Sequence, residues 1–464
     1  MERYVVVGAG AAGLTLGYHL CKAGLPVTLL EKEAQVGGLA RSFRYDEWSF
    51  DIGPHRFYSA NPKVKNFLTD ILGSGFITIP RSSAVHFMGK YHEWPLRLET
   101  IFKLPPWVAA RAGLDMIRKV RIAEAPSFEN YILRKYGRTL YQTFFKDYTE
   151  KFLGVDAART HRDWARTGVE RATIDEKTDT ASLLSIFKLM LLPKPAELHF
   201  WYPPRGVHTF WEKCAEKIRG MGGELYTGTA PSRLETRGDR VTHVVVGDRA
   251  IPVAALVWSG PIPELCRLLG LEEPALEYRS HVLYNVLLKE PPNHTWQWIY
   301  YGAPEISFSR ISNPATFSPE TVPRGRGGLC VELTCQEGDE LWRDPERVRR
   351  QVVADLVKVR AIRSEKQIEA IKIERVPKSY PIYHIDYPQR LQAARRAIKQ
   401  FTNVRLLGRT GKFWYNNMDH SIEDAFTRAS ELLGVVEPPT ERARGVLEEL
   451  RREHSMPIPQ PVRA

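Results

Sequence analysis

The sequence is poor in cysteine and has no long apolar run. Its 464 residues include five cysteines, an odd number whose spacing matches no metal-ligand motif, and a reducing compartment is their simplest interpretation. No apolar stretch approaches the roughly 20 residues that cross a bilayer. A strand pattern begins at residue 4 and leaves no space for a signal peptide before it. We therefore expect a cytoplasmic protein without a metal site.

The sequence also lacks the combined basic and aromatic modules that bind nucleic acid. Its formal net charge is +12, but the lysines and arginines are spread along the chain. Such a charge suits an anionic small-molecule substrate, and it is equally typical of a solvated basic surface. The basic amphipathic stretch 107–123 could lie on a membrane, although a helix packed within a substrate-binding domain is favoured. Homodimerisation stays open.

The N-terminal stretch carries the pattern around which the chain is organised. A β-branched run at 4–7 is followed by G-x-G-x-x-G, made by Gly8, Gly10 and Gly13, and then by a helical period. A second apolar run ends in Glu31, about 18–20 residues beyond the glycines, as in a Rossmann βαβ unit. The glycines allow a tight turn, a close approach to a pyrophosphate and close helix packing, and Glu31 can hold ribose hydroxyls. This unit predicts a dinucleotide site.

A second glycine pair sharpens the prediction to FAD. The run Q-V-G-G-L-A-R-S at 35–42 resembles the second glycine pair of flavoproteins related to the amine oxidases, and the resemblance places Arg41 near the FAD phosphates or the flavin. FAD is thus the expected cofactor. The candidate residues in this part of its site are Gly8, Gly10, Ala12, Gly13, Glu31, Lys32, Gly38, Leu39, Ala40 and Arg41.

The next motif, D-I-G-P-H-R-F-Y-S at 51–59, narrows the resemblance. It is similar to the G-[GPA]-H-x-[FI]-[FHY]-[ST] signature of UDP-galactopyranose mutases and of bacterial flavoproteins labelled protoporphyrinogen oxidase-like. The resemblance implies that His55 lies beside the flavin. Without it, we would expect a histidine in a Gly-Pro turn, bonded to the backbone.

Residues 137–151 resemble a mutase motif from the substrate side. They match G-R-x-L-Y-x-x-F-[FV]-x-x-Y-T-x-K, which implies that Tyr148 lies at the nucleotide end of the substrate site. Where the mutases place a tryptophan that stacks on uracil, this chain has Phe152 and Leu153. The mutases also grip the substrate diphosphate with an arginine on a mobile loop. Arg171 is the candidate for it, and 176–198 resembles that loop and the following helix.

The run 200–211 resembles the family pattern [FY]-Y-P-x-x-G-x-x-x-[FLM]-[WL], a turn from a strand into a helix. Trp201 is a candidate wall of the substrate site, and it could equally be an ordinary core residue. His208 is expected to be exposed in the first helical turn. After further strands, Gly260 is expected near the FAD pyrophosphate, again by resemblance.

Residues 281–336 alternate apolar and polar side chains, which predicts an antiparallel sheet on the substrate side. Arg310 stands in a run that resembles a mutase T-R-I, and it is the stronger phosphate candidate because a guanidinium can bind phosphate bidentately. Tyr380 matches the family's second phosphate tyrosine, whereas Leu333 replaces the first.

The stretch 404–421 resembles the C-terminal FAD signature of these flavoproteins. The resemblance implies that Gly408 and Arg409 approach the FAD phosphate and that the helix start at Met418 and Asp419 faces the flavin.

Together the motifs predict an α/β protein: a Rossmann-type FAD-binding domain built from discontinuous segments, a mainly helical insertion and an antiparallel-sheet substrate domain. The expected FAD-binding parts are 1–80, 201–265 and 396–435. The expected other parts are 81–200 for the helical insertion, 266–395 for the sheet domain and 436–464 for a C-terminal helix and tail.

Two activities match these motifs. The favoured one is a mutase that interconverts pyranose and furanose forms of a nucleotide sugar through N5 of the reduced flavin. The alternative is an oxidoreductase of the protoporphyrinogen oxidase or amine oxidase kind, with hydride transfer to flavin; a non-enzymatic FAD-binding protein is least supported. The catalytic candidates are His55, Arg171, Arg310, Tyr380 and Asn417, and the substrate-binding candidates are Tyr148, Trp201, Arg310 and Tyr380.

Overall fold

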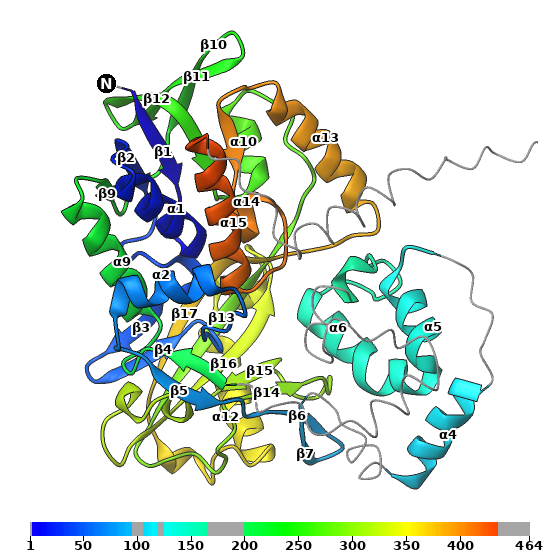
Figure 1. The fold of residues 1–464 in the computed structure, drawn as a ribbon. Helices are drawn as coiled ribbons and strands as arrows, with labels where there is room; N and C mark the ends of the chain where they lie inside the picture. Colours follow the sequence, from blue (N-terminus) through cyan, green and yellow to red (C-terminus); the bar gives the residue numbers. More distant parts are fainter. Residues whose placement is uncertain (1, 95–104, 118–124, 166–198, 435–464) are drawn as a thin grey trace, which may run out of the picture.

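The computed structural model describes residues 2–94, 105–117, 125–165 and 199–434. Figure 1 shows a parallel sheet with its helices at the top, an antiparallel sheet below it and a helical unit at the side. Three predicted features lie outside the described residues: Arg171, the loop and helix at 176–198, and the C-terminal segment 436–464.

The first sheet has the strand order β10-β11-β12-β1-β2-β9, and β18 also pairs with β12. Neighbouring strands are parallel from β18 through β12, β1 and β2 to β9, while β10 and β11 form an antiparallel hairpin that joins β12. The strands are β1 (Arg3–Val7), β2 (Val27–Leu30), β9 (Glu224–Tyr226), β10 (Arg233–Arg237), β11 (Arg240–Val246), β12 (Arg249–Trp258) and β18 (Val404–Leu406).

This sheet is covered on both faces, as its apolar strands predict. In β1, Val6 packs into one hydrophobic cluster, whereas Val5 and Val7 pack into another on the opposite face. A parallel strand that is buried on both faces has a continuous run of apolar residues instead of alternating apolar and polar residues. The first face is covered by α1 (Ala11–Lys22), α2 (Pro62–Leu72), α9 (His208–Gly220) and α15 (Met418–Leu432), and α10 (Ile262–Leu268) and α13 (Tyr387–Lys399) lie on the second.

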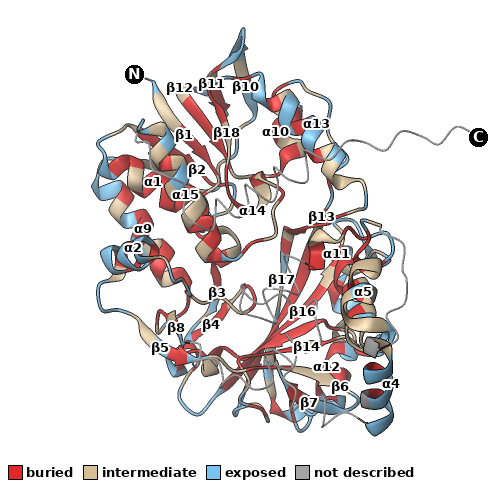
Figure 2. Ribbon diagram, turned by 45° about the vertical axis from the view of Figure 1, so that its right-hand side comes forward, coloured by how far each residue is buried: buried red, intermediate tan, exposed pale blue. Residues whose placement is uncertain are grey.

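The second sheet has the order β17-β13-β16-β15-β14-β6-β7 and is antiparallel except for the β14–β6 pair. Its buried strands form the broad red band at the lower part of Figure 2, and α12 (Arg349–Lys358) packs against one face. The strands are β6 (Ser83–Phe87), β7 (Lys90–Glu93), β13 (Tyr278–Leu288), β14 (Trp298–Tyr301), β15 (Arg310–Ser312), β16 (Gly327–Cys335) and β17 (Ile368–Pro381).

Short elements join these parts. Two small antiparallel pairs lie near the junction of the sheets: β3 (Ser42–Tyr45) with β4 (Trp48–Asp51), and β5 (Ile77–Pro80) with β8 (His199–Tyr202). The helical unit consists of α4 (Pro106–Ile117), α5 (Phe128–Leu140), a π-helical turn (Tyr141–Phe145) and α6 (Lys146–Leu153). α6 is fastened to the second sheet, because Lys151 Nζ donates to the carbonyls of Tyr301 and Ala303 at 3.2 and 3.0 Å.

The predicted fold class is confirmed: an α/β chain with a Rossmann-type parallel sheet assembled from distant segments and a separate, mostly antiparallel sheet. Within the segment 81–200, Ser83–Phe87 and Lys90–Glu93 form the hairpin β6–β7, which lies on the edge of the second sheet. None of the described helices combines the length and apolarity that crossing a membrane requires.

Candidate cofactor and substrate site

The carboxyl end of β1 turns into α1 through the predicted glycines. A Cβ atom on Gly13 would lie 1.9 Å from the Gly8 carbonyl oxygen, and one on Gly8 would lie 2.2 Å from Ser259 Oγ, so the packing itself requires both glycines. Gly10 is different: its Cβ would meet no atom closer than 3.6 Å, and its backbone is extended. The fold alone therefore leaves room at Gly10, as expected where a ligand must approach the backbone closely.

The N-terminus of α1 is suited to bind phosphate. Its N-cap residue is Gly10, which has no side chain that could cap the helix. The N–H groups of the first helical turn and the positive end of the helix dipole therefore face the space beside Gly10. These features match the requirements of a dinucleotide pyrophosphate.

Glu31 closes the same turn from the end of β2. Its two carboxylate oxygens accept from the backbone N–H groups of Ala9 at 2.8 Å and Glu33 at 3.0 Å, and the residue is 5% exposed. Burial raises its pKa, and the two backbone bonds oppose that shift. Each oxygen retains a lone pair for a ribose hydroxyl, and a carboxylate here disfavours a ribose 2′-phosphate.

The second glycine pair packs directly against the first. Gly37 donates to the Ala9 carbonyl at 2.8 Å, and a Cβ on Gly38 would lie 3.0 Å from Gly10 Cα. Arg41 turns back onto this loop and donates to the Gly38 carbonyl at 3.0 Å. The first glycine motif and the second glycine pair are separate in the sequence, but together they form one backbone cradle.

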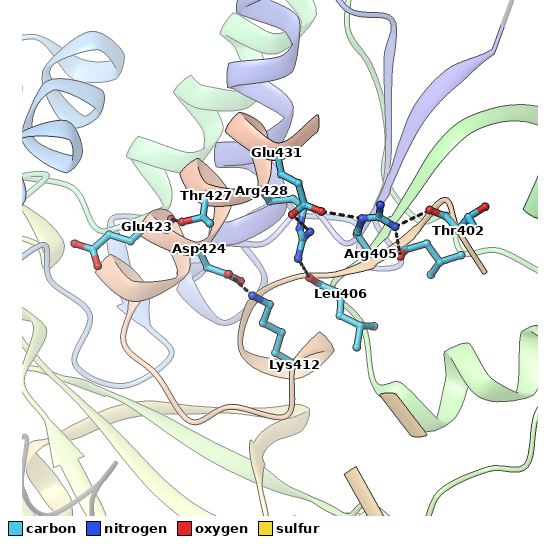
Figure 3. A network of polar contacts seen from close by, with 10 residues as sticks. Thr402, Arg405, Leu406, Lys412, Glu423, Asp424, Thr427, Arg428 and Glu431 are labelled. Carbon is cyan, nitrogen blue, oxygen red and sulfur yellow. Dashed lines mark hydrogen bonds and ion pairs between the residues drawn. The ribbon is translucent and has the colours of Figure 1, made fainter. Parts of the chain in front are cut away.

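The turn after β18 connects this cradle to the second sheet. A Cβ on Gly408 would lie 2.9 Å from Ala12 Cβ, so the short helix α14 (Gly408–Gly411) rests against α1. Asp424 on α15 accepts from the Gly408 N–H at 2.9 Å. Figure 3 shows that Asp424 also binds Lys412. The turn is therefore held in place from α15.

A second polar group in the same region ties β18 to α15. Figure 3 shows Arg405 and Arg428 converging on Glu431, and Arg405 bonds to it at 3.0 Å. These contacts fix the strand that delivers Gly408 and Arg409 to the site.

Arg409 reaches from α14 toward the second sheet and is stacked between two tyrosines. Its guanidinium carbon lies 5.2 Å from the ring centre of Tyr380 and 5.1 Å from that of Tyr415. Its Nε donates to the Asn416 carbonyl at 3.1 Å and its Nη1 to the Ser379 carbonyl at 3.4 Å. In this structure Arg409 therefore binds backbone oxygens and organises the tyrosines.

Arg310 is paired inside the protein. Its Nε and Nη2 donate to the two oxygens of Glu332 at 2.5 and 2.6 Å, and Nη2 also lies 3.3 Å from the Tyr380 hydroxyl. Both charged side chains are buried. The two parallel hydrogen bonds of this pair fix its geometry, and the two opposite charges cancel. Among the donor groups of Arg310, only Nη1 has no hydrogen-bond partner in the described part of the chain.

Four tyrosines surround this pair: Tyr148 from α6, Tyr300 from β14, Tyr380 from β17 and Tyr415 from the loop before α15. Tyr148 and Tyr300 are edge to face at 5.7 Å, and Tyr380 and Tyr415 lie 5.1 Å apart. Burial and the neighbouring Tyr300 raise the pKa of Tyr148, so its hydroxyl stays protonated. We call these four side chains with Arg310 and Arg409 the tyrosine–arginine cluster.

His55 faces the cluster from the loop between β4 and α2. Burial, and then the guanidinium groups of Arg409 and Arg310, lower the pKa of His55 to about 3. The imidazole is therefore neutral at physiological pH, able to donate one hydrogen bond and to accept another.

A buried polar network supports the same loop from behind. Asp51, at the end of β4, accepts from Ser42 Oγ at 2.5 Å, from the Tyr202 hydroxyl at 2.8 Å and from the Val207 N–H at 3.2 Å. His208 Nδ1 lies 3.0 Å from the same Ser42 Oγ. Burial lowers the pKa of His208 to about 4. The predicted exposure of His208 is thus wrong, because the Pro-Gly turn before α9 directs it inward.

Asp51 gives a prediction for pH. Burial raises its pKa from 3.8 to about 6, so the folded state binds a proton that the unfolded state releases between these values. The resulting stabilisation is fully present below about pH 3.8 and disappears as the pH rises through about 6. This difference between the pKa of Asp51 in the folded and unfolded states corresponds to at most about 3 kcal/mol of folding free energy. We expect the difference in melting temperature between the Asp51→Asn variant and the wild type to change across this window; a constant difference would contradict the assignment.

The remaining predicted residues are placed as follows. Trp201 lies on the face of β8 that packs with Phe57 and α2, with Lys65 over its ring at 5.4 Å, and is not brought to the cluster. Lys32 is exposed, and Leu39 and Ala40 pack behind the second glycine pair. Asn417 is the N-cap of α15, so Met418 and Asp419 form its first turn. Gly260 packs against the Trp258 ring.

Several residues of the cluster were not among the sequence candidates. Tyr300, Tyr415 and Arg56 belong to it or adjoin it, and Phe152 stacks with Tyr148 at 5.7 Å. The motif at 51–59 contains Arg56, directly after the histidine, which is a signal that could have been used. Tyr300 carries no comparable signal, because its place depends on the pairing of β14 with β15 and β6.

Comparison with known proteins agrees with this geometry. Residues 6–71 match the family model of the NAD(P)-binding Rossmann-like domain. A phytoene dehydrogenase from Streptomyces griseus is 26% identical over 332 residues, which cover 64% of this chain and 61% of the relative. A probable UDP-galactopyranose mutase from Klebsiella pneumoniae is 26% identical over 162 residues, 33% of this chain and 42% of the relative. The matched region thus spans less than two thirds of either relative.

Two solved structures extend the likeness over nearly the whole chain. A structure of reduced UDP-galactopyranose mutase superposes with a TM-score of 0.81 at 20% identity, covering 94% of this chain and 97% of that one. A putative protoporphyrinogen oxidase from Exiguobacterium sp. 255-15 superposes with a TM-score of 0.72 at 16% identity, covering 93% and 98%.

The glycine cradle and the family match over residues 6–71 therefore define a Rossmann-type dinucleotide-binding unit. More particularly, the chain has the fold of UDP-galactopyranose mutase-type flavoproteins, and the resemblance inferred from the motifs is confirmed.

Proposed function

We propose that this chain is an FAD-dependent enzyme that interconverts pyranose and furanose forms of a nucleotide sugar. The observation that carries the proposal is the tyrosine–arginine cluster, which adjoins the cofactor cradle through Gly408 and Arg409. Four tyrosine hydroxyls and the Nη1 group of Arg310 form a site rich in hydrogen-bond donors. Such a site suits the phosphate and hydroxyl oxygens of a nucleotide sugar.

FAD is proposed rather than NAD(P) because of the second glycine pair and the resemblance of the whole fold. When bound, FAD supplies a reducible ring whose N5 atom can act as a nucleophile. The chain's own residues would hold it: the α1 N-terminus and Gly10 at the pyrophosphate, Glu31 at a ribose, and Arg41 beside the second glycine pair.

The remaining residues position the substrate. Nη1 of Arg310 and the hydroxyls of Tyr148 and Tyr380 donate to the diphosphate, which is the leaving group of a ring interconversion. Neutral His55 lies on the same side and can accept or donate a hydrogen bond at the reacting sugar. The buried aromatic rings exclude water, which protects the reaction from hydrolysis.

A second function has one specific observation in its favour. Glu332 neutralises Arg310, and Phe152, Trp164 and Tyr415 form a continuous aromatic stack with ring spacings of 5.7 and 5.2 Å. A neutral, aromatic wall also suits a bulky apolar substrate, as an FAD-dependent oxidoreductase would require. The similarity to a phytoene dehydrogenase supports this alternative.

The proposal is tested by turnover under anaerobic conditions. Protein reduced with dithionite is incubated with a panel of nucleotide sugars, and the products are separated by chromatography beside those of the oxidised protein. We expect a furanose product from at least one nucleotide sugar, formed by the reduced protein alone. No product across the panel, together with substrate-dependent oxygen consumption on an apolar substrate, would support the oxidoreductase instead.

A further inference from the structure

Arg56 is a half-buried cation next to the candidate site. Its guanidinium carbon lies 4.8 Å from the ring centre of Phe200 and 5.0 Å from that of Trp298. Its Nε atom is buried and has no hydrogen-bond partner, and no carboxylate in the described part of the chain forms an ion pair with it. Its direct contacts in the described part of the chain are therefore with aromatic faces.

The other guanidinium groups nearby each have hydrogen-bond acceptors within the protein. Glu332 binds Arg310 in a fork, and backbone carbonyls bind Arg409. Arg81 lies 5.7 Å from the centre of the same Trp298 ring and has a hydrogen bond to Ser83 at 3.4 Å. Arg56 differs from all three because its in-plane donors have no acceptor among the described residues.

A guanidinium without an acceptor destabilises the folded protein when no ligand is bound. Burial lowers the pKa of Arg56, and the nearby Tyr300 and Asp419 oppose that shift only in part. An arginine nevertheless remains charged, so a half-buried guanidinium without an acceptor costs folding free energy. Phe200 and Trp298 hold the group, and the N–H edge is left for a ligand.

We propose that Arg56 binds an oxyanion of the substrate, a phosphate or a carboxylate, along the edge of its guanidinium. Bidentate binding of a planar or tetrahedral oxyanion is the contact that this edge makes best. Tyr300 and Tyr415 interact electrostatically with Arg56, as do the Asp419 carboxylate and the Arg310 guanidinium. The mutase signature leaves this position unspecified, so the subsite goes beyond the resemblance. It depends on the proposed function only for the presence of a substrate at the tyrosine–arginine cluster.

The test uses the full-length, FAD-loaded protein and calorimetric titration with two probes, inorganic pyrophosphate and succinate. Arg56→Met is expected to weaken binding of the preferred probe by about 10- to 100-fold, and Arg56→Lys to weaken it less. Arg81→Met, which removes a guanidinium from the same Trp298 ring, serves as the matched control and should bind as the wild type does. The probe that binds more tightly identifies the oxyanion as phosphate or carboxylate.

Thermal stability separates this role from a structural one. Without an anion, Arg56→Met should melt at a higher temperature than the wild type, because it removes the unpaired charge and keeps an unbranched chain against the two rings. Each probe that binds should raise the melting temperature of the wild type more than that of the variant. A lower melting temperature for Arg56→Met with unchanged affinity would overturn the proposal, as would a wild type that binds neither probe.

The subsite and the proposed function can fail separately. If a nucleotide sugar is turned over and Arg56→Met leaves its KM unchanged, the subsite is wrong and the proposed function stands. If Arg56→Met loses anion binding while the wild type turns over no nucleotide sugar, the subsite stands and the proposed function is wrong.

Discussion

Replacing Gly10 with valine is expected to give a folded but colourless protein. The Cβ of this residue would meet no protein atom closer than 3.6 Å, and its backbone conformation is accessible to every residue type. The added side chain instead occupies the space in which a pyrophosphate approaches the N-terminus of α1. Flavin absorbance per chain after purification should therefore fall to near zero, while circular dichroism and solubility stay close to those of the wild type.

Gly13→Ala is the matched comparison three residues away. Its Cβ would lie 1.9 Å from the Gly8 carbonyl oxygen, so this variant should lose stability rather than cofactor alone. A fully yellow Gly10→Val protein would contradict the proposed cradle. An unfolded one would show that the fold itself needs this glycine.

Removing the charge of Arg310 alone is expected to destabilise the protein strongly. Arg310→Met leaves Glu332 buried without its partner, and breaking a buried pair in this way costs about 3–5 kcal/mol. The free energy of unfolding, measured with urea, should fall by that order. Loss of turnover in this single variant would therefore not identify a substrate contact.

The double variant Arg310→Met/Glu332→Leu resolves the ambiguity. Replacing both charges with apolar side chains of similar size is often neutral for stability, so most of the lost free energy should return. Because Nη1 of Arg310 is the proposed diphosphate donor, turnover should remain at least 100-fold below that of the wild type even though flavin is bound. A double variant with near-normal turnover would exclude Arg310 from the substrate site.

The parts of the fold that were predicted correctly are those encoded by local patterns. The run at 4–7, its glycines and the acid at 31 specify a βαβ unit within one short stretch, and the structure has β1, α1 and β2 there. The alternation at 281–336 likewise predicted the strands β13, β14 and β16. Period and turn residues are properties of neighbours in sequence, so they can be read without the tertiary fold.

The features that were missed depend on contacts between distant residues. The hairpin β6–β7 joins the second sheet because β14, more than 200 residues later, offers its edge. The buried His208 contacts Ser42 of the distant strand β3, and Arg310 is neutralised by a glutamate on the neighbouring strand β16. A motif resemblance identified Arg310 as important, but not the charge that accompanies it.

The measurement that tests the proposed activity most directly is a redox cycle on one preparation with one active nucleotide sugar. The account predicts formation of the furanose when the protein is reduced, its loss after reoxidation by air, and its return on a second reduction, with no net consumption of reductant by the substrate. Product formed equally by the oxidised protein, or reductant consumed in proportion to product, would contradict it.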